Sequence, residues 1–203
     1  MADANGNSQW ITNEESRAFV HKELRDKSDA ILSTASTIIR DNASLNIRIG
    51  NTSRELTSII LDGSLRVLKE KNLNIHQPRN VSKLMLVSKM ATGFELPDYT
   101  TIIKDLYTDD KVNLKSLMNV LYNQYSINTL LVEAGPRLCK ALFEQNLVDD
   151  FFCFIGNKEW SENDKYKWTN PELNKKYKVV NRFTIKNDTC IQYNNEEWKM
   201  NLY

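Results

Sequence analysis

The sequence predicts an α/β protein built on a mostly parallel sheet flanked by helices. Apolar runs of strand length alternate with segments of helical spacing through most of the chain. Near the end, residues 178–185 and 190–193 flank the turn residues Asn187-Asp188, which predicts a C-terminal antiparallel hairpin. The chain has 203 residues, without an internal repeat or a long linker, so we expect one domain over residues 1–203.

The individual elements follow from local patterns. Thr12 and Glu15 form a capping box, which predicts a helix from Thr12 to about Lys27. Leucines at helical spacing predict a helix over residues 113–124, and Pro136 suits the first position of another helix. Asn5-Gly6 predicts a hairpin turn. Strands are expected at 30–33, 57–61, 83–87, 99–103, 129–132 and 151–155, a short extended piece at 45–49, and a brief helix within 34–41.

Composition excludes several functional classes. Lys and Arg number 27 against 26 Asp and Glu, so the net charge of +1 gives no reason to expect a nucleic-acid or membrane partner. There is no apolar run of membrane-spanning length and no secretory signal pattern. Two histidines and three separated cysteines (Cys139, Cys153 and Cys190) do not suggest a metal site or a disulfide framework. We therefore expect a cytoplasmic protein without a bound metal.

The stretch after residues 129–132 carries the most informative chemistry. Glu133 ends the predicted strand, and Ala134-Gly135-Pro136 form a turn into the next helix. Gly135 offers backbone freedom, and the free N–H groups of the helix start, with Arg137 beside them, could hold an anion. An ordinary strand–helix turn with a fortuitous glutamate is the alternative interpretation.

Other polar residues occur at strand ends and helix starts, where α/β sheets bind ligands. Ser8 and Trp10 precede the first helix, and Trp10 suits either a ring ligand or a core anchor. Arg25 ends that helix and could equally be a solvated residue. Residues 37–48 carry a hydroxyl, a carboxylate and an arginine, which suits a sugar phosphate or a plain surface loop. No nucleophile signature, phosphate-binding loop or deaminase zinc motif is present, which favours redox chemistry with a bound cofactor.

Six motifs occur in a fixed order along residues 5 to 156. They are Ser8-Gln9-Trp10-Ile11-Thr12, Ser28-Asp29-Ala30-Ile31-Leu32, Thr37-Ile38-Ile39-Arg40-Asp41-Asn42, Leu45 with Arg48, Ile59-Ile60-Leu61-Asp62 and Val132-Glu133-Ala134-Gly135-Pro136. In this order they resemble the reductase domain of the bifunctional riboflavin-biosynthesis deaminase/reductase. The resemblance implies a dihydrofolate-reductase-like fold and NADPH-dependent reduction of the ribosyl group of 5-amino-6-(5-phosphoribosylamino)uracil to ribityl.

The resemblance also implies roles for individual residues. Arg25 and Arg48 are expected near the substrate phosphate, and Glu133 is the catalytic candidate. The implied substrate contacts are Ser8, Arg25, Leu45, Arg48 and Glu133. The implied cofactor contacts are Trp10, Thr37, Asp41, Gly63, Gly135, Pro136, Arg137, Leu138, Cys139, Lys140 and Ala141.

The sequence departs from the family pattern at three places. The first family strand, of the type K-x-A-x-S-x-D-G, is absent before residue 5, so we expect an N-terminally truncated reductase domain. Gly63 stands where many relatives have serine, and Gly156-Asn157-Lys158 replaces a proline-containing loop. The family implies a homodimer and a zinc deaminase domain, upstream or on another chain. Alternatives are a non-catalytic dimerisation or nucleotide-binding module, and a reductase of another pyrimidine or a pterin.

Overall fold

The computed structural model describes residues 11–77, 83–90, 96–157 and 176–195. The chain forms two compact units, one of residues 20–135 and one of residues 1–19 with 136–203, and each is described by itself. The expectations at Ser8, Trp10 and Asn5-Gly6 lie outside the described residues. The expectation of one domain over the whole chain stays a prediction.

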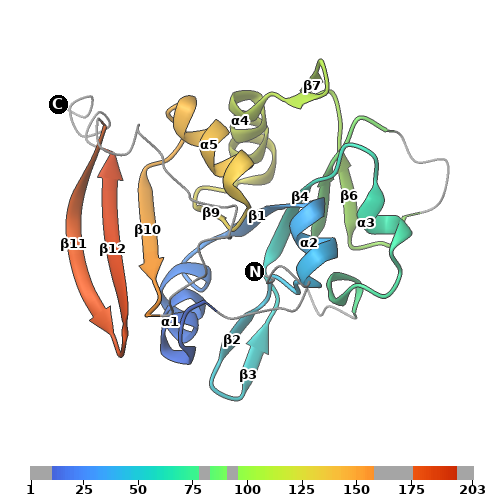
Figure 1. Ribbon diagram of the computed structural model, residues 1–203. Helices are drawn as coiled ribbons and strands as arrows, with labels where there is room; N and C mark the ends of the chain where they lie inside the picture. The colour runs from blue at the N-terminus through green and yellow to red at the C-terminus, as the bar shows by residue number, and fades with distance from the viewer. Residues whose placement is uncertain (1–10, 78–82, 91–95, 158–175, 196–203) are drawn as a thin grey trace, which may run out of the picture. The chain divides into compact units, whose positions relative to one another are not determined.

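A five-stranded parallel sheet forms the centre of unit 20–135 (Figure 1). Each strand coincides with a predicted one within about two residues, so the parallel α/β class is confirmed. Leu32 lies opposite Ile59 on one side and Val132 on the other. In sheet order the strands are β6 (Thr100–Ile103), β5 (Leu84–Val87), β4 (Thr57–Leu61), β1 (Ala30–Thr34) and β9 (Leu130–Val132).

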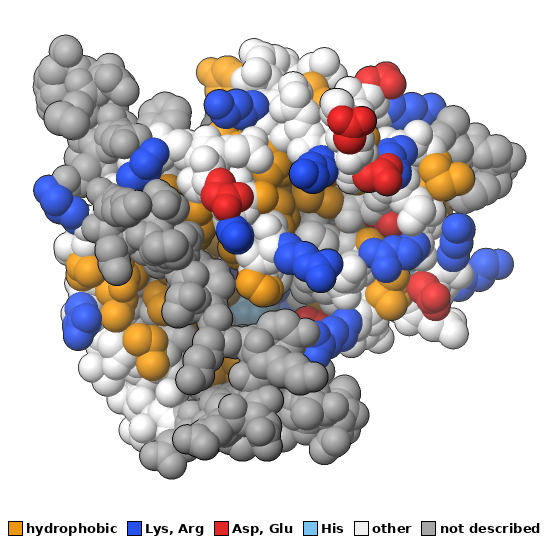
Figure 2. All heavy atoms as spheres, turned by 45° about the horizontal axis from the view of Figure 1, so that its top comes forward, with side chains coloured by type: hydrophobic (Ala, Val, Ile, Leu, Met, Phe, Trp, Pro, Cys, Tyr) orange, Lys and Arg blue, Asp and Glu red, His pale blue; other side chains and the backbone are white. Residues whose placement is uncertain are grey.

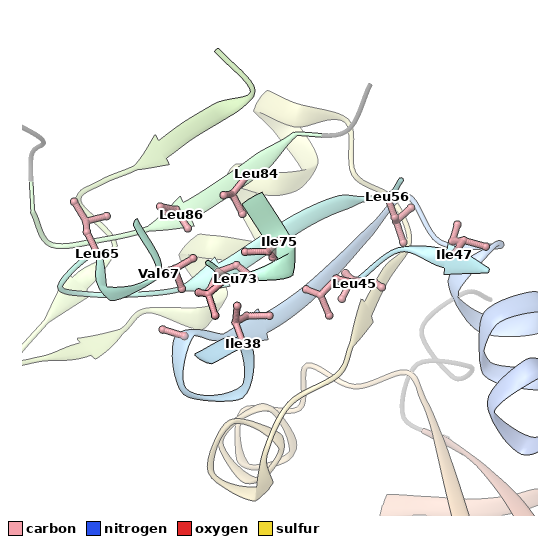
Figure 3. Close-up of a cluster of buried hydrophobic side chains, with 13 residues drawn as sticks. Ile38, Leu45, Ile47, Leu56, Leu65, Val67, Leu73, Ile75, Leu84 and Leu86 are labelled. Carbon is pink, nitrogen blue, oxygen red and sulfur yellow. The ribbon is translucent and has the colours of Figure 1, made fainter. Parts of the chain in front are cut away.

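Both faces of this sheet are covered, which explains the continuous apolar runs of its strands. On one face, alternate strand residues pack against α2 (Ala35–Asp41), α3 (Arg66–Lys69) and η2 (Asn74–His76) (Figure 3). Strand residues of the other parity are also buried, and helix α4 (Leu114–Tyr125) buries three leucines outside this cluster. The labelled cluster residues are Ile38, Leu45, Ile47, Leu56, Leu65, Val67, Leu73, Ile75, Leu84 and Leu86.

Several short elements of this unit were not predicted. They are α3, η2, β3 (Thr52–Arg54) and the small hairpin of β7 (Tyr107–Thr108) and β8 (Lys111–Val112). Strand β3 pairs antiparallel with β2 (Ile47–Ile49). Gly50 turns the chain between them with a φ of 58°, a conformation that glycine adopts without steric cost.

The other unit contains α1 (Glu14–Phe19), α5 (Pro136–Glu144) and an antiparallel sheet in the order β10-β12-β11. The sheet strands are β10 (Asp150–Ile155), β12 (Asp188–Asn195) and β11 (Tyr177–Ile185). The predicted C-terminal hairpin is therefore confirmed. An aromatic cluster around Phe143 and Tyr177, whose ring centroids are 5.1 Å apart, fills the core of this unit.

The predicted capping box is wrong. Asn13, not Thr12, caps α1, because its Oδ1 accepts the Ser16 N–H at 2.8 Å. Glu15 does not close the box but forms an ion pair with Lys186. The single helix predicted to about Lys27 is also wrong, because α1 ends at Phe19 and a π-helix, η1 (Val20–Arg25), continues the chain. Buried Asp188 holds the α1 start, accepting from the Ser16 hydroxyl at 2.6 Å.

Among the described residues, no helix combines the length and apolar character needed to cross a membrane. No group of three or more His, Cys, Asp or Glu side chains in the same ranges is arranged to hold a metal ion. On the face drawn in Figure 2, basic and acidic side chains are interspersed, in keeping with the net charge of +1.

Candidate active site

Glu133 is fixed at the carboxyl end of β9. Its backbone N–H donates to the Leu32 carbonyl of β1 at 3.0 Å, which extends the parallel ladder by one residue. Its carbonyl accepts the hydroxyl proton of Ser33 at 2.7 Å. Because both main-chain groups are held, the side chain leaves the sheet edge from a defined position.

Arg25 grips the Glu133 carboxylate with two parallel hydrogen bonds. Its Nε donates to Oε1 and its Nη2 to Oε2, both at 2.7 Å. Its remaining nitrogen, Nη1, donates to the Asn46 carbonyl at 2.6 Å. The Arg25 side chain is 12% exposed and that of Glu133 is 29% exposed. This geometry gives Arg25 a positioning role toward Glu133, and its expected contact with a substrate phosphate stays a prediction.

The π-helix η1 brings His21 into the same cluster. The Asp26 N–H donates to the His21 carbonyl at 3.0 Å, an i to i−5 bond of the kind that defines a π-helix. His21 Nδ1 accepts the Arg48 backbone N–H at 3.0 Å. Its Nε2 lies 3.4 Å from Nη2 of Arg48. Thus η1 is joined to the β2 segment by both His21 and Arg25, and π-helical turns frequently occur at functional sites.

Burial, followed by the positive charges of Arg25 and Arg48, lowers the pKa of His21 from 6.5 to about 4, against the opposing charge of Glu133. The residue is 8% exposed. The imidazole is therefore uncharged at neutral pH, and it does not repel the positive charge of Arg48. Sequence reasoning missed His21, although its position four residues before Arg25 on one helix gave a usable signal.

Two of the residues predicted to contact the cofactor lie on α2, the helix that follows β1. Thr37 and Asp41 stand four residues apart on α2, so they share one face of that helix. Thr34 caps the helix, since its hydroxyl accepts the Thr37 N–H at 3.3 Å. Leu45 is different, because the residue is 3% exposed and belongs to the hydrophobic core. Its φ is 50°, so any ligand contact from Leu45 would come from its backbone.

Gly63 follows β4 in close contact with its neighbours. A Cβ at this position would lie 3.3 Å from the Tyr107 hydroxyl and 3.4 Å from Cε of Lys89. The Tyr107 hydroxyl donates to the Val87 carbonyl at 3.1 Å, and Lys89 pairs with Asp110. Burial, and secondarily the charge of Asp62, raises the pKa of Tyr107. Because Gly63 has no side chain, it leaves space next to Lys89 and Tyr107 that a larger residue would fill.

The predicted anion site at Gly135 to Ala141 falls on the boundary between the units. Gly135 does not have a positive φ, and an added Cβ would meet no described atom within 4 Å. The backbone at this position therefore does not require glycine, contrary to the expectation. Pro136 is the first residue of α5, as predicted. Leu138 is buried and Cys139 packs on the aromatic cluster, so both could reach a ligand only through the backbone. Lys140 pairs with Glu144 at 3.6 Å.

Solved structures define the fold. A RibD structure from Acinetobacter baumannii superposes with a TM-score of 0.72 at 20% identity, covering 96% of this chain and 54% of that one. A deaminase/5-amino-6-(5-phosphoribosylamino)uracil reductase from Thermotoga maritima gives 0.71 at 25% identity, covering 96% and 52%. The fold is therefore that of the dihydrofolate-reductase-like reductases, as predicted.

Sequence comparison then gives the family. The model of the RibD C-terminal domain matches residues 1–188, and the chain belongs to this family. It is 32% identical over 162 residues to the 5-amino-6-(5-phosphoribosylamino)uracil reductase of Buchnera aphidicola, covering 76% of this chain and 77% of that protein. It is 34% identical to the riboflavin biosynthesis protein RibD of Haemophilus influenzae, covering 86% of this chain but 48% of that protein. The chain thus spans about half the length of such RibD proteins.

Proposed function

We propose that this chain reduces the ribosyl group of 5-amino-6-(5-phosphoribosylamino)uracil to ribityl, with NADPH as the reductant. The observation that carries the proposal is the Glu133 carboxylate, held by Arg25 at the carboxyl end of a parallel strand beside His21 and Arg48. Family membership and the 32% sequence identity to a protein named as this reductase support the same conclusion.

The segments that follow β1, β4 and β5 carry residues that suit a phosphorylated dinucleotide. Thr37 and Asp41 offer a hydroxyl and a carboxylate for sugar hydroxyls, and Arg66 and Lys89 offer positive charge for phosphates. Arg66 already donates to the Ser36 hydroxyl at 3.1 Å, which holds its guanidinium at the start of α2. When bound there, NADPH would supply a hydride to the anomeric carbon of the sugar in its ring-opened or imine form.

Glu133 would orient the substrate at this site. Each carboxylate oxygen can accept more than one hydrogen bond, so the two bonds from Arg25 leave acceptor capacity for a sugar hydroxyl. The partial exposure of Glu133 leaves the carboxylate within reach of a ligand. Arg25 would hold this carboxylate in a fixed orientation, and Arg48 would bind the substrate phosphate.

Other parts of the proposal rest on the family resemblance. Ser8 would contact the substrate and Trp10 the cofactor, and the backbone of Gly135 to Ala141 would hold cofactor phosphates. We also propose a homodimer in the cytoplasm, working with a zinc deaminase domain that supplies the substrate.

The direct test is whether the purified chain oxidises NADPH when 5-amino-6-(5-phosphoribosylamino)uracil is added. The oxidation is measured as the loss of reduced-nicotinamide absorbance. Glu133→Gln should lower kcat by about 10²-fold or more, with cofactor binding unchanged by fluorescence. Glu144→Gln is the matched control, because Glu144 is exposed on α5 and its partner is Lys140. The proposal is refuted if the unmutated chain shows no substrate-dependent oxidation of NADPH and does not bind NADPH.

A further inference from the structure

Two hydrogen-bond donors face each other beside Glu133. The Arg48 backbone N–H donates to His21 Nδ1, so Nδ1 carries the lone pair. A neutral imidazole with this tautomer has its proton on Nε2, and Nε2 lies 3.4 Å from Nη2 of Arg48. A guanidinium has no acceptor atom. The short contact therefore joins two donors and cannot itself be a hydrogen bond.

The surrounding charges favour an anion at this place. The charged groups that act on His21 are Arg25 from its own helix, Arg48 from β2, and Glu133 after β9. Arg25 is committed to the Glu133 carboxylate and the Asn46 carbonyl through all three of its nitrogens. Arg48 is exposed, and its guanidinium faces a second hydrogen-bond donor, the Nε2–H of His21.

We propose that His21 Nε2–H and the Arg48 guanidinium together bind an oxygen of a phosphate monoester, so that His21 is a substrate-binding residue. This rests on the proposed function for the identity of the substrate, but not for the presence of the anion site. An anionic oxygen accepting from both atoms would satisfy the two facing donors. Because the imidazole is neutral, it adds a fixed N–H without adding a second charge to repel Arg48.

The first test needs no catalysis and uses inorganic phosphate as the probe. The chain contains two histidines, His21 and His76, so two imidazole signals are expected by NMR. His76 Nε2 bonds the Val67 carbonyl at 2.8 Å and provides an internal reference. Saturable phosphate titration should shift the His21 signals and leave those of His76 in place, and Arg48→Gln should abolish the shift. An unmoved His21 signal through the millimolar range would overturn the proposal.

The second test separates the donor from the structural role of the ring. In His21→Asn, the Asn Oδ1 can still accept the Arg48 N–H, but the donor at the Nε2 position is lost. We expect KM for the phosphorylated substrate to rise roughly ten-fold, while kcat stays within about two-fold. A rise of this size corresponds to the loss of one hydrogen bond to a charged group. Lys22→Gln, at a neighbouring side chain that is 70% exposed, is the control and should leave KM unchanged.

The outcomes distinguish this proposal from the proposed function. A phosphate-dependent His21 shift in a chain that does not oxidise NADPH would retain the anion site and refute the reductase. Full reductase activity, with His21→Asn behaving like Lys22→Gln, would refute the role of His21 and retain the reductase.

Discussion

The pairing of Arg25 with Glu133 gives a quantitative test by a double-mutant cycle. The perturbations are Arg25→Met, Glu133→Gln and the two combined. Breaking a buried ion pair by removing one partner costs about 3–5 kcal/mol. Glu133 is 29% exposed, so water replaces part of the lost interaction and we expect about 2–3 kcal/mol for each single change. The coupling energy between the two sites should then be about 2 kcal/mol.

The assay is urea denaturation of the four proteins, comparing midpoints at a constant slope. The double variant should lose about 2 kcal/mol less than the sum of the single losses, because neither charge is left buried without its partner. Strictly additive losses, with coupling below about 0.5 kcal/mol, would show that the two bonds of 2.7 Å do not stabilise the fold. That result would also remove the argument that Arg25 positions the Glu133 carboxylate.

Three further changes have expected outcomes. The pKa of His21 is lower in the folded chain, about 4 against 6.5, so the unfolded chain binds more protons and stability should fall between pH 6.5 and 4 by at most about 3 kcal/mol. His21→Asn should flatten this part of a denaturation-midpoint profile, and an unchanged profile would contradict the assignment. Gly63→Ser should cost less than about 1 kcal/mol in thermal melting, because the new Cβ would lie 3.3 Å from the Tyr107 hydroxyl and 3.4 Å from Cε of Lys89, and small shifts of these side-chain ends would accommodate it; a loss above about 2 kcal/mol would show a rigid contact. Asp188→Ala should cost about 2 kcal/mol in urea denaturation, because Asp188 is buried and bonds Ser16 at the start of α1; an unchanged midpoint would contradict this.

The strands could be predicted because a parallel sheet buried on both faces requires unbroken apolar runs. The stretch Thr57–Leu61 has the same bounds in the sequence prediction and in β4. The elements that escaped prediction are two to four residues long, such as α3 and the β7–β8 hairpin. Elements of that length carry no periodicity, and packing against neighbours rather than propensity decides them.

The start of the first helix shows how tertiary contacts override a local motif. The Thr12 capping box matched a known sequence pattern, yet Asn13 caps the helix. The Asn13 N–H is held by Asp188, 175 residues away, and Glu15 is drawn to Lys186. These two distant partners lie on the C-terminal hairpin, and a reading of residues 12–15 alone could not include them.

The site residues were predicted individually, whereas their arrangement depends on contacts far apart in sequence. Arg25 and Glu133 are 108 residues apart, and nothing local to either predicts a bidentate pair. Arg25 was therefore expected to bind a phosphate, while the structure gives its three nitrogens to Glu133 and Asn46. His21 was overlooked because a single histidine carries no motif of its own, and its spacing of four residues from Arg25 becomes informative only once Arg25 is placed in the site.

The pairing changes where an anion can bind. Arg25 and Glu133 cancel each other's charge within one bidentate contact, and His21 is neutral above its pKa of about 4. Of the four ionisable side chains in the cluster, Arg48 alone then contributes an unbalanced charge. Its exposed guanidinium faces the His21 N–H, so the positive potential and the facing donors coincide at one point. A phosphate bound by Arg48 and His21 would leave the Glu133 carboxylate available to the sugar, because Arg25 is already bonded to that carboxylate and not to the phosphate.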